Sequence, residues 1–598
     1  MFMTKQLKRS DVPEELTWDL TKIFESDEQH QAALESVSAK MSELVTLRGT
    51  LGESADKLYQ SIKQMEEVMR EIGTAYIYAH LKSDQDTANG TYQTMMAKTI
   101  NLYVQLEATL AFVTPEILSI PQDTLDNYIN SHEQLKDYKH YFERLTSKRA
   151  YVLSDKEEEL LAGAADVMSA SEKTASQLMN ADLKHGEVTN LDGERQRLTN
   201  GLYSQLVEST NRQARQEAYE VMYTSFGTVK NTLASTLSST IKSHNYTAKV
   251  RGYNSARHQA LSENFVPEEV YDTLVNVVNE KLPLFHRYLA LRKKVLKLDE
   301  LRMFDMYTPI VGEAPISFTK ESAQEITLKA LAPLGDEYVA LLKRAFDERW
   351  IDWEENEGKR TGAYSSGNYD TAPYVLMNWR DSVNQLYTLV HELGHSLHSY
   401  FTHQAQPYQY GSYPIFLAEI ASTTNENLLT EYLLQTEKDP TVRAYIINHY
   451  LDGVKGTVFR QTQFAEFEHF MYEQDAKGQP LTQDFLSESY GKLNEKYYGI
   501  PADEYISLEW ARIPHFYYNY YVFQYSTGFS AASALAKRIL TEGQSAVNRY
   551  FGFLKAGISD YPINVMKEAG VDMTQATYLE EALSVFEERL NELETLLA

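Results

Sequence analysis

The spacing of apolar residues along the chain predicts helices almost throughout. Apolar side chains recur three and four positions apart with polar residues between them, and this spacing places them on one face of a helix. The segments with this pattern are 34–44, 55–72, 91–112, 155–180, 209–244 and 267–298, and it returns from residue 381 almost to the C-terminus. A mainly α fold is therefore expected.

Three stretches depart from helical spacing and predict strands. Within 183–198, Asn190-Leu191-Asp192-Gly193 separates two short segments rich in Val, Thr and charged residues, which is typical of a small hairpin. Residues 301–310 and 361–379 also have strand character. In the last stretch, Tyr374–Asn378 fits two alternatives. It is either an edge strand that holds an extended substrate through free backbone groups, or an ordinary core strand.

The length of the chain sets the expected number of lobes. At 598 residues it exceeds the usual size of a single core, so two or three lobes are expected. We place the boundary at the predicted hairpin, between an N-terminal helical lobe, residues 1–185, and a second region, residues 186–598. The sequence has no internal repeat and no low-complexity tract that would indicate a different organisation.

Composition excludes several classes of function. The formal net charge is -27, which argues against nucleic acid as a partner because phosphate binding needs clustered Lys and Arg. The chain has no Cys, which excludes disulfides, Cys-ligated zinc and a thiol nucleophile, and fits a reducing compartment. Neither residues 1–25 nor any later stretch contains an apolar run of signal-peptide or bilayer-spanning length. We expect a cytoplasmic protein with no membrane partner.

One short segment carries the chemistry. His391-Glu392-x-x-His395 lies in a predicted helix, where residues four apart share a face, so both imidazoles can hold one metal ion. Glu392 is offset by one position and can reach a water on that metal as a general base. The apolar stripe of the same helix, with the two His at its edge, consists of Val383, Leu386, Tyr387, Val390, Gly394, Leu397 and Phe401.

Catalytic zinc usually has three protein ligands and a water, and several residues could supply the third ligand. His398 shares the face of His391, but a rigid helix spaces three side chains too widely to converge easily. His403 lies beyond the expected helix end. Glu419 is in a second predicted helix, where Glu426 and Glu431 are also available. Ser422 and Glu426 are candidates to orient the ligands.

The strength of this pattern can be compared with rival interpretations. With 15 His and 84 acidic residues in 598 positions, about 0.05 matches to the metal motif are expected by chance. A di-iron carboxylate bundle would use Glu392-x-x-His395 with Glu466-x-x-His469, but about two such pairs are expected by chance. A binding protein with structural zinc has no need of Glu392 as a base. A zinc exopeptidase remains an alternative, although no group that captures a chain terminus is evident.

An aromatic segment offers groups that could stabilise an oxyanion. If 515–525 is helical, His515, Tyr518 and Tyr525 fall on about one face, with Tyr520 and Tyr521 as possible replacements for either tyrosine. His or Tyr side chains can donate to the developing negative charge of a tetrahedral intermediate. With 42 Tyr in the chain, an ordinary aromatic packing stripe is the competing interpretation.

Four segments together resemble oligoendopeptidase F, of the thimet oligopeptidase-like zinc metallopeptidase family. His391-Glu392-Leu393-Gly394-His395-x-x-His398 resembles the extended zinc motif of the family. Pro414-x-x-x-x-Glu419 resembles its third-ligand segment. The run from Arg512 to Tyr521 resembles its downstream His/Tyr segment, and Leu16-Thr17-Trp18-Asp19-Leu20 is typical of the oligoendopeptidase F branch.

The resemblance covers the whole chain and implies both fold and activity. It implies a mainly α, two-lobed zincin shell around a deep substrate channel, with a small β-sheet near the active site and residues 186–598 as the catalytic region. It also implies Glu419 as the third ligand of one Zn²⁺ per chain, and a cleft-lining role for the segment of His515, Tyr518 and Tyr525. The expected activity is hydrolysis of internal bonds in short peptides, because only flexible, narrow chains can enter such a channel.

Overall fold

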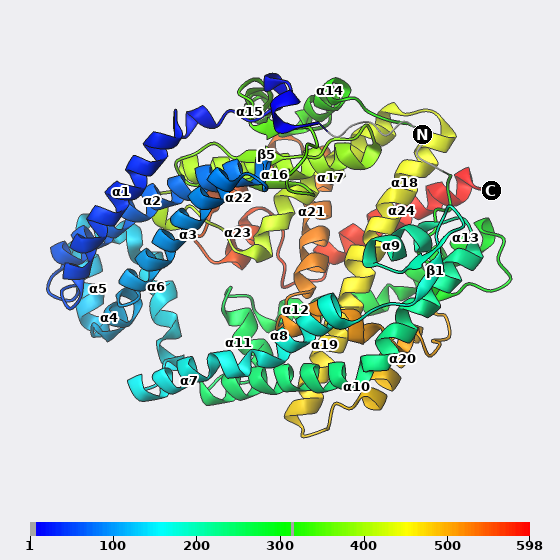
Figure 1. The fold of residues 1–598 in the computed structure, drawn as a ribbon, viewed down its shortest axis with the longest axis horizontal. Coiled ribbons are helices and arrows are strands. Elements are labelled where there is room, and N and C mark those ends of the chain that lie inside the picture. The colour runs from blue at the N-terminus through cyan, green and yellow to red at the C-terminus, as the bar shows by residue number, and fades with distance from the viewer. Residues whose placement is uncertain (1–6, 313–315) are drawn as a thin grey trace. The chain divides into compact units, whose positions relative to one another are not determined.

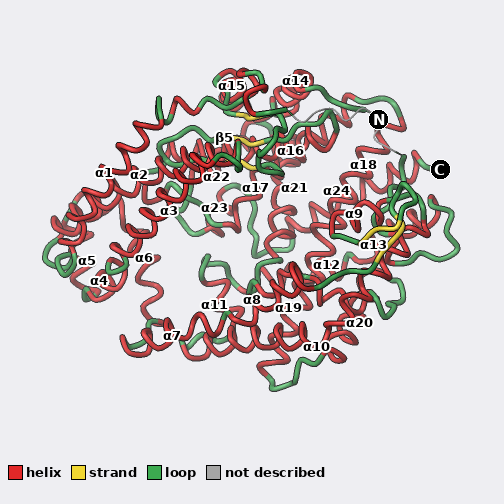
Figure 2. Tube along the Cα trace, viewed as in Figure 1, coloured by secondary structure: helices red, strands yellow, loops and turns green. Residues whose placement is uncertain are grey.

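Helices make up most of the computed structural model, which describes residues 7–312 and 316–598 (Figures 1 and 2). The mainly α fold with small sheets is therefore confirmed. The chain divides into two compact units, each assembled from three segments. Unit 1 comprises Met1–Ala150, Ile316–Tyr432 and Leu535–Gly570, and unit 2 comprises Tyr151–Pro315, Leu433–Ala534 and Val571–Ala598. The lobe boundary between residues 185 and 186 stays a prediction. The sequence analysis expects no signal peptide in residues 1–25, of which residues 1–6 lie outside the described residues.

Unit 1 contains the first helices of the chain and the helices around the metal motif. They are α1 (Asp27–Leu44), α2 (Ala55–Gln85), α3 (Gly90–Leu110), α4 (Val113–Ser119), α5 (Gln122–Ser131), α6 (Lys139–Ser147), α14 (Lys320–Ala330), α15 (Asp336–Asp347), α16 (Val383–Ala405), α17 (Ile415–Thr436, to Tyr432), α22 (Gln544–Ala556) and α23 (Pro562–Glu568). Side chains of Ser26, Ser54 and Asn89 cap α1, α2 and α3 by accepting backbone N–H groups of the first turn, which explains where these helices begin. The three helices pack together (Figure 1). Buried residues at the predicted spacing, such as Leu34 and Leu58, belong to their common core.

A three-stranded sheet supports the metal motif in unit 1. Its order is β3 (Ile351–Asp352), β5 (Tyr374–Leu376), β4 (Tyr364–Ser366), with β3 parallel and β4 antiparallel to β5. Of the two alternatives for Tyr374–Asn378, the core strand is right and the edge strand is wrong. The side chains of β5 are apolar and at most 1% exposed, so both faces are covered, and a strand on each side satisfies its backbone.

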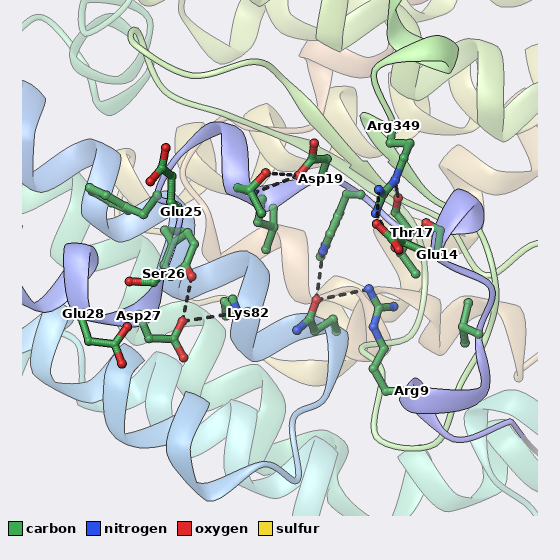
Figure 3. A pocket seen from close by; sticks show the side chains of 17 residues that line it. Arg9, Glu14, Thr17, Asp19, Glu25, Ser26, Asp27, Glu28, Lys82 and Arg349 are labelled. Carbon is green, nitrogen blue, oxygen red and sulfur yellow. Dashed lines mark hydrogen bonds and ion pairs between the residues drawn. The ribbon is translucent and has the colours of Figure 1, made fainter.

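The N-terminal segment Leu16–Leu20 is fastened to this sheet. The Leu16 carbonyl accepts the Trp353 N–H at 2.9 Å, and the Trp18 ring packs edge-on against Tyr374. Arg349 donates to the Glu14 carboxylate at 2.8 Å and to the Thr17 carbonyl at 3.0 Å (Figure 3). Glu14, Thr17, Trp18 and Arg349 line a pocket of about 550 Å³. The cationic side chains of the pocket, Arg9, Lys82 and Arg349, pair with acidic or carbonyl groups of the same unit. The segment thus has a structural role in holding the sheet.

Unit 2 contains the longest helix and the predicted hairpin. Its helices are α7 (Asp155–Met168), α8 (Ala170–Gln177), α9 (Asn200–Glu208), α10 (Arg212–Val250), α11 (Ala256–Ser262), α12 (Glu268–Glu280), α13 (Leu282–Val295), α18 (Pro440–Val454), α19 (Arg460–Ala476), α20 (Gln483–Tyr498), α21 (Phe523–Glu542, to Ala534) and α24 (Thr577–Leu596). The hairpin pairs β1 (Glu187–Thr189) with β2 (Arg195–Arg197), and the intervening turn uses Gly193 at a φ of +84°. The hairpin prediction is therefore confirmed.

The strand predicted over 301–310 is wrong, because this segment forms a short 3-10 turn at Met303–Asp305. The buried Asp305 carboxylate accepts the Arg302 backbone N–H at 3.0 Å and pairs with Arg212 and Arg215. Local side-chain acceptors thus satisfy the backbone that a β-ladder would otherwise satisfy.

None of the helices in residues 7–312 and 316–598 combines the length and the apolar character needed to cross a bilayer. The cytoplasmic location expected from the sequence stays a prediction.

Candidate metal centre

Helix α16 presents the metal motif as the sequence predicts. Ser382 caps its first turn by accepting the Gln385 N–H at 3.2 Å. All seven residues of the predicted apolar stripe, Val383 to Phe401, are buried. The side chains of His391 and His395 are 27% and 20% exposed at the edge of that stripe. The buried stripe therefore fixes the helix while the two imidazoles stay accessible.

Three side chains converge at this edge. The Nε2 atoms of His391 and His395 lie 3.3 and 3.4 Å from the Glu419 Oε2 of α17. Within residues 7–312 and 316–598, these three form the one group of His, Cys, Asp or Glu side chains whose ligand atoms all lie within 4.8 Å of one another. Two imidazoles and one carboxylate are a donor set that suits a catalytic zinc, which keeps a further position for water.

Glycine allows the two ligand-bearing helices to approach this closely. A Cβ atom at Gly394 would lie 2.5 Å from the Ser422 Cα and 2.9 Å from the Ala421 carbonyl oxygen, closer than non-bonded atoms tolerate. The Asn425 amide also donates to the Val390 carbonyl at 3.0 Å, which ties α17 to α16. Position 394 of the motif therefore sets the spacing of the metal ligands.

Glu426 and Ser422, the two residues expected to orient the ligands, act on different ones. Glu426 Oε1 lies 2.5 Å from His391 Nδ1, an arrangement that leaves Nε2 facing Glu419. The Ser422 hydroxyl donates to Glu419 Oε2 at 3.1 Å, so it orients the carboxylate and not an imidazole. His391 and Glu419 thus each have an orienting partner on α17 that is not itself a metal ligand.

The close approach of the ligands governs their protonation. Burial lowers the pKa of His391, but hydrogen bonds to Glu419 and Glu426 outweigh it and raise the pKa to about 10. Burial raises the pKa of Glu419, and the two imidazoles more than reverse this, so its pKa is well below the usual range. Because a ligating imidazole is neutral, a metal ion must displace the proton that His391 would otherwise hold.

Glu392 is a buried carboxylate beside this cluster. It is 8% exposed, and burial raises its pKa above the ordinary range, while the charges of His391 and His395 oppose that rise. A hydrogen bond with the Ser365 backbone on β4 also favours the charged form. A carboxylate with a raised pKa next to a metal site suits a group that takes and returns a proton.

His398 and His403, the other two His considered as the third ligand, lie apart from the cluster. His398 is 1% exposed and stacks on Tyr413 with ring centroids 3.8 Å apart. Its burial lowers its pKa to about 3. His403 lies within α16, so its expected position beyond the helix end is wrong, and it packs against Tyr369. Both are packing residues. For His398 this agrees with the expectation that a rigid helix spaces three side chains too widely for all of them to reach one metal ion.

The contact between β4 and α16 was not predicted from the sequence. The hydroxyl of Ser365 lies 2.8 Å from that of Ser396, which is fully buried on α16. Serine at these positions carries no periodic signal, so only the fold shows that β4 lies directly beside the metal motif.

The His/Tyr segment in unit 2 is not helical, so the prediction of a shared helix face for His515, Tyr518 and Tyr525 is wrong. A 3-10 turn covers Pro514–Tyr517, and α21 begins only at Phe523. Between them, Asn519 and Tyr520 have φ values of +50° and +61°, which a right-handed helix cannot contain.

The three candidate side chains are nevertheless close together within unit 2. The Tyr525 hydroxyl lies 3.5 Å from His515 Nε2, and the ring centroids of His515 and Tyr518 are 5.6 Å apart. Tyr518 is 49% exposed. Burial lowers the pKa of His515, so its imidazole is held neutral near pH 7.

The second Glu-x-x-His pair does not form a metal site. Glu466 accepts hydrogen bonds from Asn279, Lys496 and Tyr497, and His469 Nδ1 lies 3.1 Å from the Tyr520 hydroxyl. The di-iron alternative is therefore not favoured.

Comparison with known proteins decides the family. The family described as "Peptidase family M3" matches residues 205–585, and "Oligopeptidase F" matches residues 116–185. The chain belongs to peptidase family M3. It is 52% identical to oligopeptidase PepF of Bacillus subtilis over 98% of this chain and 88% of that protein. It is 48% identical to group B oligopeptidase PepB of Streptococcus agalactiae over 99% and 98%.

Two solved structures have a similar fold. The crystal structure of oligoendopeptidase-F from Enterococcus faecium is 49% identical, with a TM-score of 0.73 over 95% of this chain and 99% of that one. A putative peptidase from Chlamydophila abortus is 33% identical, with a TM-score of 0.94 over 99% and 100%.

These relationships confirm the resemblance to oligoendopeptidase F and the prediction of a metalloendopeptidase. The predicted zinc metallo-oligopeptidase is supported over its alternatives, and the family implies a metal, typically zinc, for which His391, His395 and Glu419 are the candidate ligands.

Proposed function

We propose that this M3 peptidase binds one Zn²⁺ per chain through His391, His395 and Glu419 and hydrolyses internal bonds of short peptides. The observation that carries the proposal is the convergence of the three ligand atoms, with both imidazole Nε2 atoms within 3.4 Å of one carboxylate oxygen. The names of the relatives, oligopeptidase and oligoendopeptidase, support short peptides as the substrate class.

In this proposal Glu392 is the general base. When bound, zinc polarises the scissile carbonyl and lowers the pKa of water at the site toward about 7. Glu392 takes the proton from the attacking water and later passes it to the leaving amine. Its burial and raised pKa support this double role, because the group must hold the proton between the two steps.

The cluster of His515, Tyr518 and Tyr525 is proposed to donate hydrogen bonds to the oxyanion. Its support is the proximity of the three side chains, with the Tyr525 hydroxyl 3.5 Å from His515 Nε2, and the exposure of Tyr518, which leaves a donor accessible to a substrate. Loss of one oxyanion donor typically costs about 10²–10³-fold in kcat.

The test is cleavage of an internally quenched peptide of roughly ten residues, blocked at both ends, by the native chain and by Glu392→Gln. Native enzyme should cut internally, lose activity with a chelator and recover it with zinc. Glu392→Gln should lose at least about 10²-fold in rate while retaining one zinc per chain by elemental analysis. Glu357→Gln is the matched control, because this exposed carboxylate of unit 1 lies outside the cluster.

Two outcomes would overturn the proposal. If the native enzyme carries zinc but cuts only peptides with a free end, the exopeptidase alternative replaces internal cleavage. If Glu392→Gln keeps the native rate, Glu392 is not the base.

A further inference from the structure

The turn that joins the two halves of the His/Tyr cluster has a strained backbone. Asn519 and Tyr520 both adopt the left-handed conformation. The described chain has five non-glycine residues with positive φ, and among them only these two are adjacent in sequence. Bulky residues rarely adopt this conformation, whereas asparagine does so more readily, so the strain lies mainly at Tyr520. Such strain persists only where surrounding contacts hold it, and it is often found at functional sites.

Two neighbouring residues of α19 hold Tyr520 at both ends. Glu468 Oε1 accepts the Tyr520 backbone N–H at 2.7 Å, and His469 Nδ1 lies 3.1 Å from the Tyr520 hydroxyl. The rings of Tyr472 and Tyr271 pack against Tyr520 at centroid distances of 4.7 and 5.6 Å. The left-handed residue is thus fixed through both its backbone and its side chain.

Glu468 is unusual for a buried carboxyl group. It is fully buried, and its Oε2 has no hydrogen-bond partner among the described residues. Burial raises its pKa to about 8, against the opposing effect of the Tyr520 N–H, so the group is mainly a neutral acid at pH 7. Burying a carboxyl group with one oxygen unsatisfied costs stability. Stability alone therefore does not explain glutamate at this position.

The Tyr520 turn decides where the cluster residues lie. His515 and Tyr518 precede the turn, and Tyr521 and Tyr525 follow it, yet the rings of His515 and Tyr521 each contact the other three. The centroid of His515 is 6.1 Å from that of Tyr521 and 5.9 Å from that of Tyr525. A change of φ at Tyr520 to the right-handed region would redirect the chain and separate the two halves.

We propose that Glu468 is a positioning residue that, with His469, holds Tyr520 left-handed and so places the cluster of His515, Tyr518 and Tyr525. The inference rests on the proposed function of that cluster in the reaction. Glu468 acts through the backbone of Tyr520 and does not touch the substrate.

Two substitutions at Glu468 distinguish the effect of its hydrogen bond to Tyr520 from the effect of its side-chain volume. Glu468→Gln keeps an oxygen that accepts the Tyr520 N–H, so kcat should stay within about threefold of the native value. Glu468→Met keeps the volume but removes the acceptor, so kcat should fall at least about 10-fold with little change in KM, since small displacements of positioned groups are costly. Glu488→Met is the matched control, because Glu488 is an exposed carboxylate of α20, and this variant should keep the native kcat.

A double-mutant cycle with His515→Ala gives the decisive measurement. If Glu468 works through the cluster, the loss from Glu468→Met should largely vanish in the His515→Ala background. Multiplicative losses, or equal losses for Glu468→Met and Glu468→Gln, would overturn the positioning role. If Glu468→Met does not fold, His469→Leu takes its place in the cycle with His515→Ala, because His469 is only partly buried.

The same variants keep the two proposals apart. If His515→Ala, Tyr518→Phe and Tyr525→Phe all keep the native kcat, the cluster has no catalytic role and both proposals fail. If those variants lose activity but Glu468→Met and His469→Leu do not, only the positioning role fails. Zinc content, measured for every variant, should remain one per chain.

Discussion

Replacing Gly394 by alanine adds one methyl group where α16 and α17 are closest. The new Cβ atom would lie 2.5 Å from the Ser422 Cα, whereas carbon atoms in ordinary contact are about 3.5–4.0 Å apart. The two backbones must therefore separate by about 1 Å or more, because neither contact atom belongs to a flexible side chain.

A separation of this size is large for a metal site. His391 and His395 lie on α16 and Glu419 on α17, so the movement acts directly on the distance between the imidazoles and the carboxylate. Zinc–ligand bonds of about 2.0–2.2 Å tolerate deviations of only about 0.2 Å. We expect Gly394→Ala to weaken zinc binding by at least about 100-fold, and overpacking to cost about 1–3 kcal/mol of stability.

The assay is competition for zinc between the protein and a chromogenic chelator, with thermal unfolding of the same samples. Gly163→Ala is the matched control, because a Cβ atom at this position of α7 meets nothing within 4 Å. Alanine should be neutral or stabilising there. Zinc affinity of Gly394→Ala within threefold of the native value, with unchanged Tm, would refute the argument that glycine sets the helix spacing.

Three further predictions concern other carboxylate side chains. Glu426→Gln should weaken zinc binding about 10–100-fold in the same competition assay, because it removes the charged partner of His391 Nδ1; native affinity would contradict the orienting role. Asp305→Ala should lower the free energy of unfolding by about 3–5 kcal/mol in urea, since it leaves Arg215 buried without its carboxylate; a loss below 1 kcal/mol would contradict this. Burial raises the folded pKa of Glu468 to about 8, so the free energy of unfolding is highest below the ordinary pKa of the group and falls as pH rises toward 8. The facing hydroxyls of Tyr271, Tyr472 and Tyr520 stay protonated there, because their pKa values are raised well above 10. Between pH 5 and pH 8, the free energy of unfolding of Glu468→Gln should therefore rise by about 3 kcal/mol relative to that of the native chain, measured by urea unfolding at both pH values. If the difference between the two proteins is the same at both pH values, Glu468 does not titrate in this range.

The residues around the metal motif show what could be predicted from the sequence. The stripe from Val383 to Phe401 fixes the helix and the face of His391 and His395, because period and burial coincide there. The third ligand could not be chosen among Glu419, Glu426 and Glu431 by spacing, since the choice depends on how α17 packs on α16. The resemblance to a known family selected Glu419, and the geometry agrees.

The errors share a physical cause. The helical face of His515, Tyr518 and Tyr525 failed because two left-handed residues interrupt the chain, and the contacts that hold them come from α19. The strand over 301–310 failed because Asp305 satisfies the local backbone through its own carboxylate. In both segments, polar side-chain contacts override the local pattern, and apolar spacing does not encode such contacts.

The parts of the metal centre differ greatly in how far apart they lie along the chain. The contact between Asn425 and Val390, which joins α17 to α16, spans 35 residues, whereas the contact between Trp18 and Asp352, which joins the N-terminal segment to β3 of the supporting sheet, spans 334. Closing a short loop loses less chain entropy, so local contacts form faster than distant ones. During folding, the helical hairpin that carries the ligands should therefore be able to capture its metal before the N-terminal segment closes over the sheet. Metal present at that stage would then stabilise an intermediate as well as the finished enzyme.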